Sequence, residues 1–514
     1  LGSAEARIKR LSLGKDISNN IWATFDLSYQ KLNTKEKEIF RLLGGAWAKG
    51  ATVKLLAGAM ETQLTDYDSI DSGLRGLAKR ALVRTESIGE YKRYLMHNLV
   101  QDFAQSLIVD SGQTITELRL KWLTSVVTYV NYYCEDSPDN HTHLELELDN
   151  LLGAAAWAAE MGKWTEVDQI AIAMHEKSGF ILRRGYASRA VGLLQLAREA
   201  AQNLGDKSHE GLHTGNLGMA FFEISDYTQA LECYKKALDI SRELGDKTCE
   251  SRWLGSIGFV NDSLSRYSEA IKCYEGAIQI DREIGNQKGV GKWLGSAAGA
   301  YRLIGNSEKA VQYYEEAIQI ARQMNDKVTE AVHLSNLGNA HRSWGWGNFE
   351  KAIECYSQAI QIARDTGDIM TEARATINSA RVKSWLGNSE PALIELDHGL
   401  DLFTQIGFRS GQAYSHGYKG EIYRALGKQT EAKFETELAL TIHKEVHVLH
   451  GQSDWLNNLG VWAGQDSRVE EGIHFLEEAL EIRKKLGLAK VAETEMALKK
   501  LSDLLCKNLE KANE

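Results

Sequence analysis

The feature that most constrains this chain is an internal repeat of 40 residues, which begins near residue 190 and continues almost to the end. A small residue opens each repeat, and one step lengthens to 42 where Trp344-Gly345-Trp346-Gly347 adds two residues. These markers are Ala190, Ala230, Ala270, Ala310, Ala352, Ala392, Ala432 and Gly472. A fixed period of this size is typical of solenoids, in which each unit packs against its neighbours. We therefore expect a stacked array in this region.

Within each repeat, the spacing of small and aromatic residues follows the turn of a helix. Four residues after the marker come Tyr234, Tyr274, Tyr314 and Tyr356, and three residues further come Ala237, Ala277, Ala317 and Ala359. Another small residue lies twelve before the marker, or fourteen in the lengthened repeat: Gly218, Gly258, Ala298, Gly338, Ala380, Gly420 and Gly460. Small residues let two helices approach closely, and the aromatic ring fills the space beside them. The pattern predicts helical hairpins.

The turns between these helices carry glycine followed by a capping residue. Gly305-Asn306-Ser307 and Gly387-Asn388-Ser389 predict a left-handed stop and a side-chain N-cap within hairpins. Between hairpins, the same role is predicted for Gly205-Asp206, Gly245-Asp246, Gly285-Asn286 and Gly367-Asp368. Together these residues resemble the tetratricopeptide repeat, in a 40-residue variety covering roughly 180–510. The resemblance implies an all-α, right-handed solenoid over 190–514, closed by a capping helix at about 491–508.

Composition limits the function classes that fit the chain. It has 514 residues, a net charge of -10, six cysteines and no apolar run long enough for a membrane helix. Bulk attraction to nucleic acid or an anionic membrane is therefore disfavoured, and a reduced, cytoplasmic compartment is expected. The beginning, Leu1-Gly2-Ser3-Ala4, has no signal-peptide character, and we expect a fragment of a longer protein.

Residues 1–110 follow a different pattern from the repeats. Asn33-Thr34 predicts the cap of a helix that runs through Leu43, and residues 81–85 and 91–95 predict two strands around a turn at 87–90. Short helices followed by a small hairpin predict a winged-helix-like domain.

Four sequence blocks here resemble the winged-helix domain of signal-transduction ATPases with numerous domains (STAND), of the NB-ARC type. The blocks are Leu27-Ser28-Tyr29, Leu32, Phe40-Arg41-Leu42-Leu43 and Leu95-Met96-His97-Asn98-Leu99-Val100. In that family a Met-His-Asp triplet ends the domain and its histidine contacts the phosphates of ADP. The resemblance implies this role for His97 in the full-length protein, although Asn98 replaces the aspartate. The alternative is a satisfied histidine at the start of a helix.

The phosphate-binding loop that such a nucleotide needs is missing from this chain. Residues 45–52 have its two glycines and threonine, but alanine stands where the lysine must be. We expect an ordinary turn between helices there. The resemblance implies a nucleotide-binding domain outside this chain and ADP or ATP as cofactor of the full-length protein only.

Residues 111–189 are predicted to form a helical linker, with helices at 114–133, 144–160 and 164–176. Residues 145–158 resemble the helical bridge that joins winged helix to repeats in the same family. Residues 136–143 are expected to be a loop and are the best candidate for a linker.

Two motifs suggest metal chemistry that the repeat explains more simply. His209-Glu210-Gly211-Leu212-His213 fits the zinc-protease pattern. However, Glu210 has counterparts in Glu250, Glu330 and Glu372, and His213 in Trp253, Trp293, His333 and Trp455. No downstream pattern suggests a third ligand. His443, His447 and His450 are interpreted as a solvated helix end, and we predict neither metal ligands nor catalytic residues.

A binding groove is predicted along the first helices of the hairpins. In tetratricopeptide arrays these helices line the concave face, where this chain places Arg252, Lys292, Arg302, Arg342, Arg374, Arg381 and Arg424. The acids among the lining positions of the same repeats are Asp262 and Glu421. Phe222, Phe259, Trp385 and Tyr414 would add apolar anchors. An acidic peptide or protein segment would fit such a groove, whereas the alternative is that the arginines pair with neighbouring glutamates.

Three functions remain open. The first is the ligand-sensing part of a STAND-type ATPase, not itself an enzyme, which relays binding to the nucleotide domain and oligomerises on activation, in defence, cell death or transcriptional control. The second is a stand-alone scaffold or adaptor. The third is a DNA-binding regulator that uses Arg75, Lys79 and Arg80, although three charges are few for strong binding.

Overall fold

The computed structural model describes residues 17–61, 67–110, 114–344, 348–486 and 490–513. Residues 1–16, and residues 345–347 within the lengthened step of the repeat, lie outside the described residues. The chain divides into two compact units, Leu1–Asp246 (unit 1) and Lys247–Glu514 (unit 2). The boundaries predicted at 110 and 189 are not tested by this division and stay predictions.

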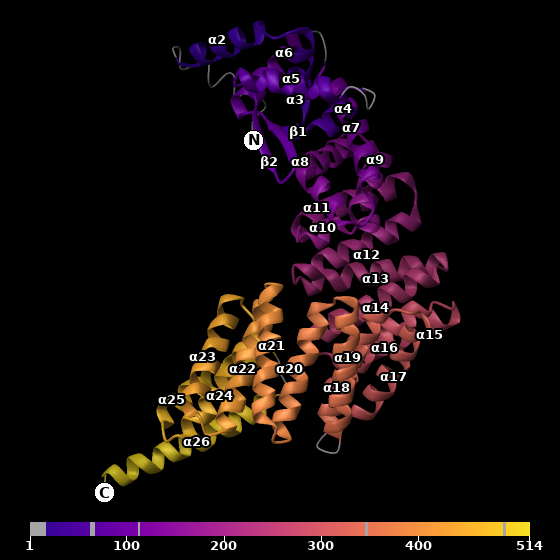
Figure 1. The fold of residues 1–514 in the computed structure, drawn as a ribbon. Coiled ribbons are helices and arrows are strands. Elements are labelled where there is room, and N and C mark those ends of the chain that lie inside the picture. Colours follow the sequence, from indigo (N-terminus) through magenta and orange to yellow (C-terminus); the bar gives the residue numbers. More distant parts are fainter. Residues whose placement is uncertain (1–16, 62–66, 111–113, 345–347, 487–489, 514) are drawn as a thin grey trace. The chain divides into compact units, whose positions relative to one another are not determined.

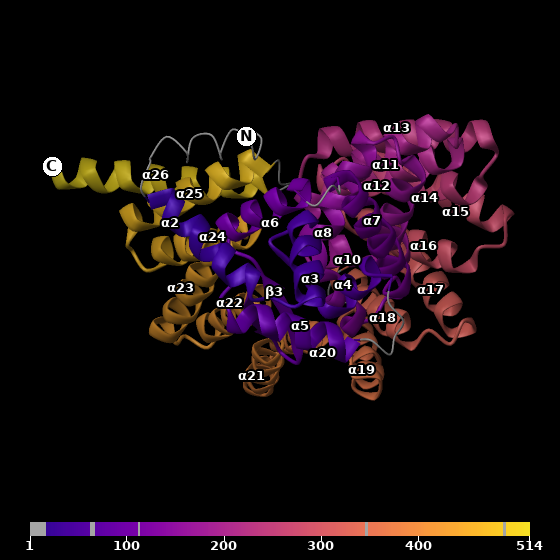
Figure 2. The ribbon, with the colours of Figure 1, turned by 90° about the horizontal axis from the view of Figure 1, so that it is seen from above.

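Unit 1 begins with helices and three short strands (Figure 1). In chain order these are α2 (Ile17–Gln30), α3 (Thr34–Gly45), β1 (Gly50–Thr52), α4 (Val53–Ala59), α5 (Tyr67–Lys79), β2 (Arg84–Ile88), β3 (Tyr91–Leu95) and α6 (Asn98–Asp110). The strands form one antiparallel sheet in the order β1-β3-β2. Helices α3, α4 and α5 pack together, with β3 against α4 (Figure 2).

The hairpin predicted in this region is confirmed, but its first strand lies three residues later than expected. Ala81 has a positive φ of 55° at the end of α5. Leu82 and Val83 are then buried before β2 begins at Arg84. These apolar residues fill the core instead of extending the strand. An apolar run in the sequence does not distinguish a strand from a buried segment before it.

Strand β1 was not predicted, so the expectation of a simple turn over residues 45–52 is wrong. Gly50 pairs with Leu95 and Thr52 with Arg93. A Cβ on Gly50 would lie 2.7 Å from the Cα of Leu95, so only glycine allows this approach. Three residues are too few for an alternating pattern to reveal a strand.

The remaining helices of unit 1 lead into the first hairpin of the repeat. They are α7 (Ile115–Tyr132), α8 (Pro138–Glu160), α9 (Trp164–Ala171), the π-helix η2 (Ile172–Lys177), α10 (Phe180–Arg183), α11 (Ala187–Leu204), α12 (Lys207–Glu223) and α13 (Tyr227–Leu244). The loop predicted over residues 136–143 is wrong for most of its length, because α8 already begins at Pro138. The hydroxyl of Ser137 accepts from the backbone N–H of Asn140, and proline at the first helical position favours this beginning.

One hydrophobic core extends through unit 1, from Leu32 to Cys233. The indole of Trp122 on α7 donates to the carbonyl of Leu42 on α3 over 2.8 Å. The helix cap predicted at Asn33-Thr34 is present as a capping box, since Asn33 and Glu36 exchange hydrogen bonds of 2.9 Å. Residues 32–108 and the helices α7, α8 and α9 therefore share one packed interior.

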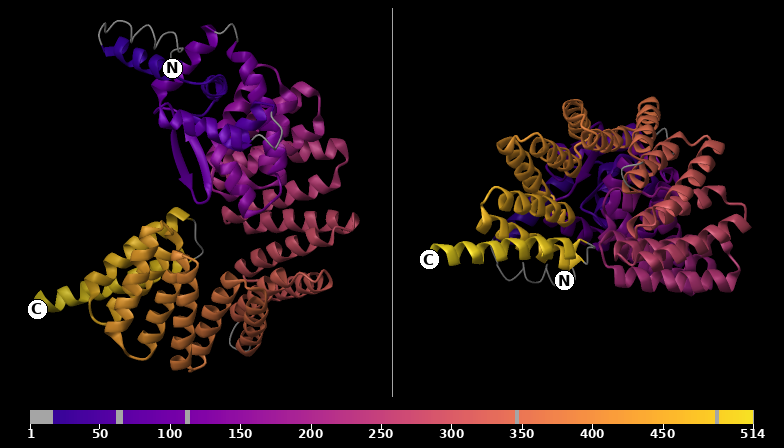
Figure 3. Two further views of the ribbon diagram at one scale, coloured as in Figure 1. Left: turned by 45° about the horizontal axis from the view of Figure 1, so that its top comes forward. Right: turned by 90° about the horizontal axis from the view of Figure 1, so that it is seen from below.

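Unit 2 consists, in its described residues, of paired helices that follow one another in chain order (Figure 3). The pairs are α14 (Lys247–Ser263) with α15 (Tyr267–Glu283), α16 (Gln287–Leu303) with α17 (Ser307–Gln323), α18 (Lys327–Trp344) with α19 (Phe349–Thr366), α20 (Ile369–Trp385) with α21 (Ser389–Gln405), α22 (Arg409–Ala425) with α23 (Gln429–Glu445), and α24 (Leu449–Gln465) with α25 (Val469–Leu486). The last helix, α26 (Val491–Asn513), packs on α25 and α24. The predicted all-helical repeat fold is confirmed.

The small residues and tyrosines interlock as the spacing predicted. A Cβ added to Gly338 would lie 2.6 Å from the ring of Tyr356, and one added to Gly218 in unit 1 would lie 2.9 Å from that of Tyr234. In a later repeat Leu476 takes the tyrosine's place, 2.8 Å from a Cβ on Gly460. The later repeats therefore keep the contact after losing the aromatic ring.

The turn chemistry is confirmed at most positions. Gly305 has a φ of 82°, and the side chain of Asn306 accepts from the backbone N–H of Lys309 over 3.2 Å. Gly387 has a φ of 90°, but Asn388 makes no side-chain cap, so that part of the prediction is wrong. Glycine sets the turn at this position without help from the next side chain.

Candidate functional site

The candidate binding surface of unit 2 follows the first helix of each pair. Helices α14, α16, α18 and α20 each contact the next first helix in the series, up to α22. These contacts place the first helices side by side (Figure 3). The predicted lining residues of unit 2 belong to these helices. We call this surface the groove, defined by Arg252, Lys292, Arg302, Arg342, Arg374, Arg381 and Arg424.

Lys292 on α16 lies over two aromatic rings. Its ammonium is 4.2 Å from the ring centre of Trp293 and 5.4 Å from that of Phe259. The pKa of Lys292 is lowered, first by burial among neighbouring groups and then by the charge of Arg252. The side chain is nevertheless exposed to solvent, which is consistent with an apolar stem held against protein and an accessible charge.

Arg302 and Arg342 each approach the tyrosine of their own hairpin. Arg302 interacts with Tyr314, and Arg342 with Tyr356. The charge of Arg302 also acts on Asp262, whose pKa is raised by burial. The guanidinium of Arg342 lies 5.8 Å from the ring centre of Trp385, and its Nε is buried without a hydrogen-bond partner among the described residues.

Arg374 on α20 is exposed, and its guanidinium lies 5.7 Å from the ring centre of Phe408. Within the described chain, no carboxylate lies within 4.0 Å of the charged nitrogens of Lys292, Arg302, Arg342 or Arg374. These four side chains are cations without an ion pair. For them, the alternative of pairing with neighbouring glutamates does not hold.

Two further arginines of the groove, Arg381 and Arg424, are neutralised by ion pairs. Arg381 forms an ion pair with Glu421 over 3.1 Å and lies 4.4 Å from the ring centre of Tyr418. Arg424 donates two hydrogen bonds, of 2.7 and 2.9 Å, to the carboxylate of Asp466. For these two residues the pairing alternative holds. Arg252 lies 5.5 Å from the ring centre of Trp253.

The predicted apolar anchors differ in exposure. Trp385 is 37% exposed and its ring packs 5.5 Å from that of Phe349. Phe259 and Tyr414 are half-buried, the latter against Trp455 and His443. Phe222 lies in unit 1 on α12, beside Tyr227. Trp385 is therefore the anchor that offers the largest free face.

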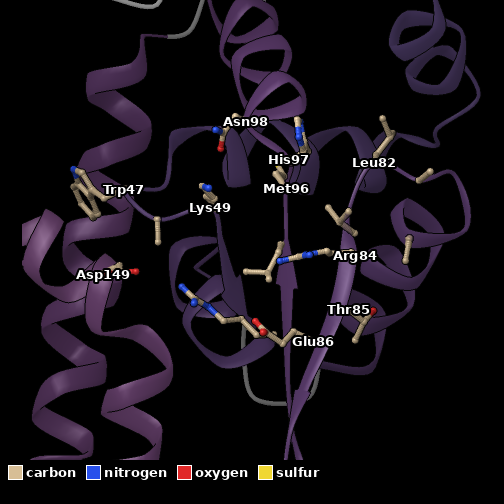
Figure 4. A pocket seen from close by; sticks show the side chains of 16 residues that line it. Trp47, Lys49, Leu82, Arg84, Thr85, Glu86, Met96, His97, Asn98 and Asp149 are labelled. Carbon is tan, nitrogen blue, oxygen red and sulfur yellow. The ribbon is translucent and has the colours of Figure 1, made fainter. Parts of the chain in front are cut away.

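A second candidate site is a cavity of about 950 Å³ in unit 1, beside the sheet. Lys49, Arg84, Arg93 and His97 line it together with the acids Glu86 and Asp149. Figure 4 shows Lys49, His97 and Asn98 in its upper part and Arg84 and Glu86 below. Basic groups thus outnumber acidic ones around the residue that the resemblance assigns to phosphate contact.

His97 also makes a hydrogen bond at the start of a helix, as the alternative to phosphate contact predicted. Its Nδ1 accepts from the backbone N–H of Leu99 over 3.3 Å, at the start of α6. The rest of the imidazole is exposed to the cavity. A cap at Nδ1 leaves Nε2 available, so this geometry is compatible with both interpretations.

The stretch that resembles a phosphate loop has its backbone groups occupied. The backbone N–H of Ala48 donates to Asn150 over 2.8 Å, and that of Thr52 donates to Glu147 over 2.5 Å. Asn150 also donates to the carbonyl of Gly50 over 2.8 Å. Two side chains of α8 therefore hold the loop and β1, a contact that the sequence analysis missed because the partners are about a hundred residues apart.

The interpretation of Glu210 as a repeat residue is confirmed by its contacts. Glu210 pairs with Lys207 three residues earlier over 2.6 Å, as Glu250 does with Lys247 over 2.7 Å. The histidines of the same motif, by contrast, meet a residue outside the repeat. His209 and His213 both contact Asp168 on α9. Asp168 could not be predicted from the zinc-protease pattern, because it lies upstream of the two histidines and the pattern places the third ligand downstream.

The histidines near residue 447 do not form a solvated helix end as expected. His443 is fully buried at the end of α23, and its Nδ1 accepts from the indole N–H of Trp455 over 3.0 Å. Gly451 leaves room for the ring. His447 lies in the turn and His450 on α24, so the three do not share one helix.

Two of the three basic residues proposed for DNA contact form ion pairs within unit 1. Arg75 forms an ion pair with Asp71, and Arg80 with Glu36. Paired arginines offer less charge to a phosphate backbone.

Comparisons with known proteins identify the repeat. Residues 212–283, 250–323 and 289–365 match the tetratricopeptide repeat model, and residues 453–486 match another model of the same repeat. A comparison with curated protein sequences finds no match. The repeat assignment made from glycine, alanine and tyrosine spacing is confirmed.

Solved structures with similar folds share little sequence with this chain. The apo quorum sensor NprR from B. thuringiensis matches with a TM-score of 0.50 and 17% identity, over 69% of this chain and 98% of its own. Aspartyl phosphate phosphatase F from Bacillus subtilis matches at 0.49 and 12%, over 71% and 95%. A STAND protein with a tetratricopeptide repeat sensor from Pyrococcus horikoshii matches at 0.46 and 16%, over 83% of this chain and 66% of its own. At these identities the likeness concerns the fold.

No helix in the described ranges combines the length and the apolar character that crossing a membrane requires.

Proposed function

We propose that unit 2 binds an acidic, extended segment of a protein or peptide in the groove. The observation that supports this proposal is the set of four cations without an ion pair on the consecutive first helices α16, α18 and α20 (Lys292, Arg302, Arg342 and Arg374). A chain of net charge -10 that keeps these cations unpaired offers a positive strip to an acidic ligand. Arginine's planar fork fits carboxylates in particular.

The aromatic residues beside the cations suit a ligand that also has an apolar side chain. Trp385 is partly exposed between Arg342 and Arg381, whose guanidinium groups lie 5.8 and 5.0 Å from its ring centre. Tryptophan and arginine are the residue types that contribute most to binding at protein interfaces. An acidic segment with one aromatic or aliphatic anchor matches this arrangement.

We infer further that the chain is the ligand-sensing part of a STAND-type signalling ATPase. The succession α3-β1-α4-α5-β2-β3 supports a winged helix in unit 1. His97 and the basic residues of its cavity would then contact the phosphates of ADP or ATP held by a nucleotide domain outside this chain. Ligand binding in the groove would shift the equilibrium of this switch and favour oligomerisation. Cysteines that form no disulfide within the described chain fit a cytoplasmic protein, and defence signalling is the expected context.

Charge reversal in the groove tests the binding proposal. A fluorescein-labelled peptide of glutamates with one central tryptophan is the probe, and its affinity for the full chain is measured by anisotropy. The double variant Arg302→Glu/Arg342→Glu is expected to bind at least about tenfold more weakly, or about 1.4 kcal/mol. The matched control is Lys272→Glu/Lys351→Glu, which makes the same charge change at exposed positions of the second helices α15 and α19.

The control should keep the affinity of the unaltered chain. Equal affinities of both double variants would overturn the groove proposal, because net charge alone would then explain binding. The nucleotide part is tested separately by identifying the nucleotide that co-purifies with the full-length protein. A full-length protein free of nucleotide would favour the stand-alone scaffold.

A further inference from the structure

Three side chains of unit 1 that take no part in the proposed groove or nucleotide cavity converge at one point. Asp168 lies on α9, and His209 and His213 lie one turn apart on α12. The Nε2 of His213 is 2.6 Å from one oxygen of Asp168, and the Nδ1 of His209 is 3.0 Å from the other. All three ligand atoms lie within 4.8 Å of one another.

We propose that Asp168, His209 and His213 bind a divalent transition metal ion, with Zn²⁺ the best match. Two imidazole nitrogens and one carboxylate oxygen are ligands that Zn²⁺ prefers, and three protein ligands with one open position are common. A tetrahedral site places ligand atoms about 3.4 Å apart, given metal–ligand bonds of about 2.1 Å. The two histidine–carboxylate separations, 2.6 and 3.0 Å, need to widen by less than about 1 Å to reach this value.

The environment suits a bound ion that remains in place. Asp168 and His213 are buried, at 7% and 1% exposure, whereas His209 is half-exposed. An ion would therefore enter from the side of His209 and keep a water ligand there. The Nδ1 of His213 is buried without a hydrogen-bond partner among the described residues, so it would carry the ring proton without an acceptor while Nε2 binds the ion.

The repeat does not account for this cluster. The positions equivalent to His209 in the next repeats are Cys249, Gly289 and Thr329, and the positions equivalent to His213 are Trp253, Trp293 and His333. Trp293 donates instead to Asp281 on the preceding helix, over 2.9 Å. The hairpin of α12 and α13 thus differs from the next hairpins in the two residues that contact α9.

The contacts of Glu210 assign this ion a structural role. In the zinc-protease pattern the glutamate acts as a base on the metal-bound water. Here the two carboxylate oxygens of Glu210 accept from Gln202 and Lys207 over 2.7 and 2.6 Å. The ion would join the segment before the repeats to the first repeat helix, and it would stabilise unit 1 by binding the folded state.

Metal titration of the full chain tests the proposal. After treatment with a chelator and dialysis, the chain is titrated with Zn²⁺ by calorimetry and with Co²⁺ by visible absorption. We expect one equivalent to bind, a tetrahedral Co²⁺ spectrum and an increase of Tm with Zn²⁺. His209→Ala and Asp168→Asn should each weaken binding by at least about tenfold, since even residues behind the ligands cost that much.

His474→Ala removes an exposed histidine of unit 2 and serves as the control, which should bind as the unaltered chain does. If Asp168→Asn disturbs folding, His209→Ala decides the outcome, because its half-exposed side chain can be removed without a cavity. No stoichiometric binding, or equal binding by His209→Ala and the control, would overturn the proposal.

Discussion

Gly258 and Tyr274 are in direct contact across the hairpin of α14 and α15. A Cβ built on Gly258 would lie 2.6 Å from Cε1 of the Tyr274 ring, closer than packed atoms come. Tyr274 is fully buried, and burial raises the pKa of its hydroxyl. The close approach of the two helices therefore depends on the missing side chain of residue 258.

Gly258→Ala is expected to lower the free energy of unfolding of the chain by roughly 1 kcal/mol, measured by urea denaturation. Overpacking opposes a gain in helix propensity of about 1 kcal/mol, and Ala298 occupies the same position in the next repeat, so the loss should be at the low end. Gly299→Ala is the control, since its Cβ would meet Tyr314 at an ordinary 3.5 Å. A control that is destabilised as much as Gly258→Ala would contradict the interlock.

Asn150 connects the bridge helix to the sheet of unit 1 through hydrogen bonds to Ala48 and Gly50, each of 2.8 Å. It also donates to Glu147, a fully buried carboxyl whose pKa is raised by burial. Asn150→Leu should destabilise unit 1 by roughly 2–4 kcal/mol, because it leaves buried polar groups without partners.

The neighbouring variant Asp149→Ala removes an exposed ion pair with Arg189 and should cost less than about 1 kcal/mol. Thermal denaturation of both variants compares the two residues. Similar Tm values would show that the loop does not depend on α8.

The repeat could be predicted because its signal is periodic, whereas unit 1 depends on contacts that no period reveals. Gly258 and Tyr274 recur in equivalent pairs along the chain, so their contact is visible from spacing alone. Asp168 approaches His213 from 45 residues upstream, and Asn150 reaches Ala48 across 102. Neither pair belongs to a repeated pattern, so tertiary packing alone brings them together.

For the groove, the sequence predicts which positions line it but not which of their cations form ion pairs. The offset from the small residue identified the first-helix positions, including Lys292 and Arg424. It did not separate paired from unpaired cations, because Asp466 lies 42 residues beyond Arg424 on the next first helix. Two adjacent helices must be placed before such a pair can be recognised.

His443 makes the stability of unit 2 depend on pH. Burial lowers its pKa to about 4 from an ordinary 6.5. The unfolded chain binds a proton at this histidine below pH about 6.5 while the folded chain does not, so stability is present above that pH and is lost as the pH falls toward about 4. At pH 4.5 the loss from this residue should be on the order of 2 kcal/mol.

His443→Gln keeps an acceptor for the indole of Trp455 but does not titrate in this range. We expect a smaller decrease in stability between pH 7 and pH 4.5 than in the unaltered chain, measured by urea denaturation at both values. His474→Gln changes an exposed histidine of the same unit and should keep the original pH dependence. An unchanged slope in His443→Gln would contradict the assignment.

Arg342 and Arg424 occupy equivalent positions of their repeats in the groove. Substitution by glutamine should lower mainly peptide affinity at Arg342 and mainly stability at Arg424. Arg424 is held by two hydrogen bonds from its guanidinium to Asp466, and these bonds hold the pKa of that carboxyl below its usual range. Arg424→Gln removes this partner and should lower the free energy of unfolding by roughly 1 kcal/mol. It should leave the affinity for the labelled acidic peptide unchanged, because a neutralised arginine contributes little charge to the groove.

Arg342→Gln should show the reverse pattern. Arg342 has no ion pair within the described chain and lies 5.8 Å from the ring centre of the partly exposed Trp385, so its removal leaves no protein carboxylate without a partner. Peptide affinity should fall by about three- to tenfold, or about 1 kcal/mol, while the urea midpoint stays close to that of the unaltered chain. The opposing outcome is that Arg424→Gln weakens peptide binding as strongly as Arg342→Gln does. That result would contradict the distinction between paired and unpaired cations, because the ligand would then compete with Asp466 for the guanidinium of Arg424.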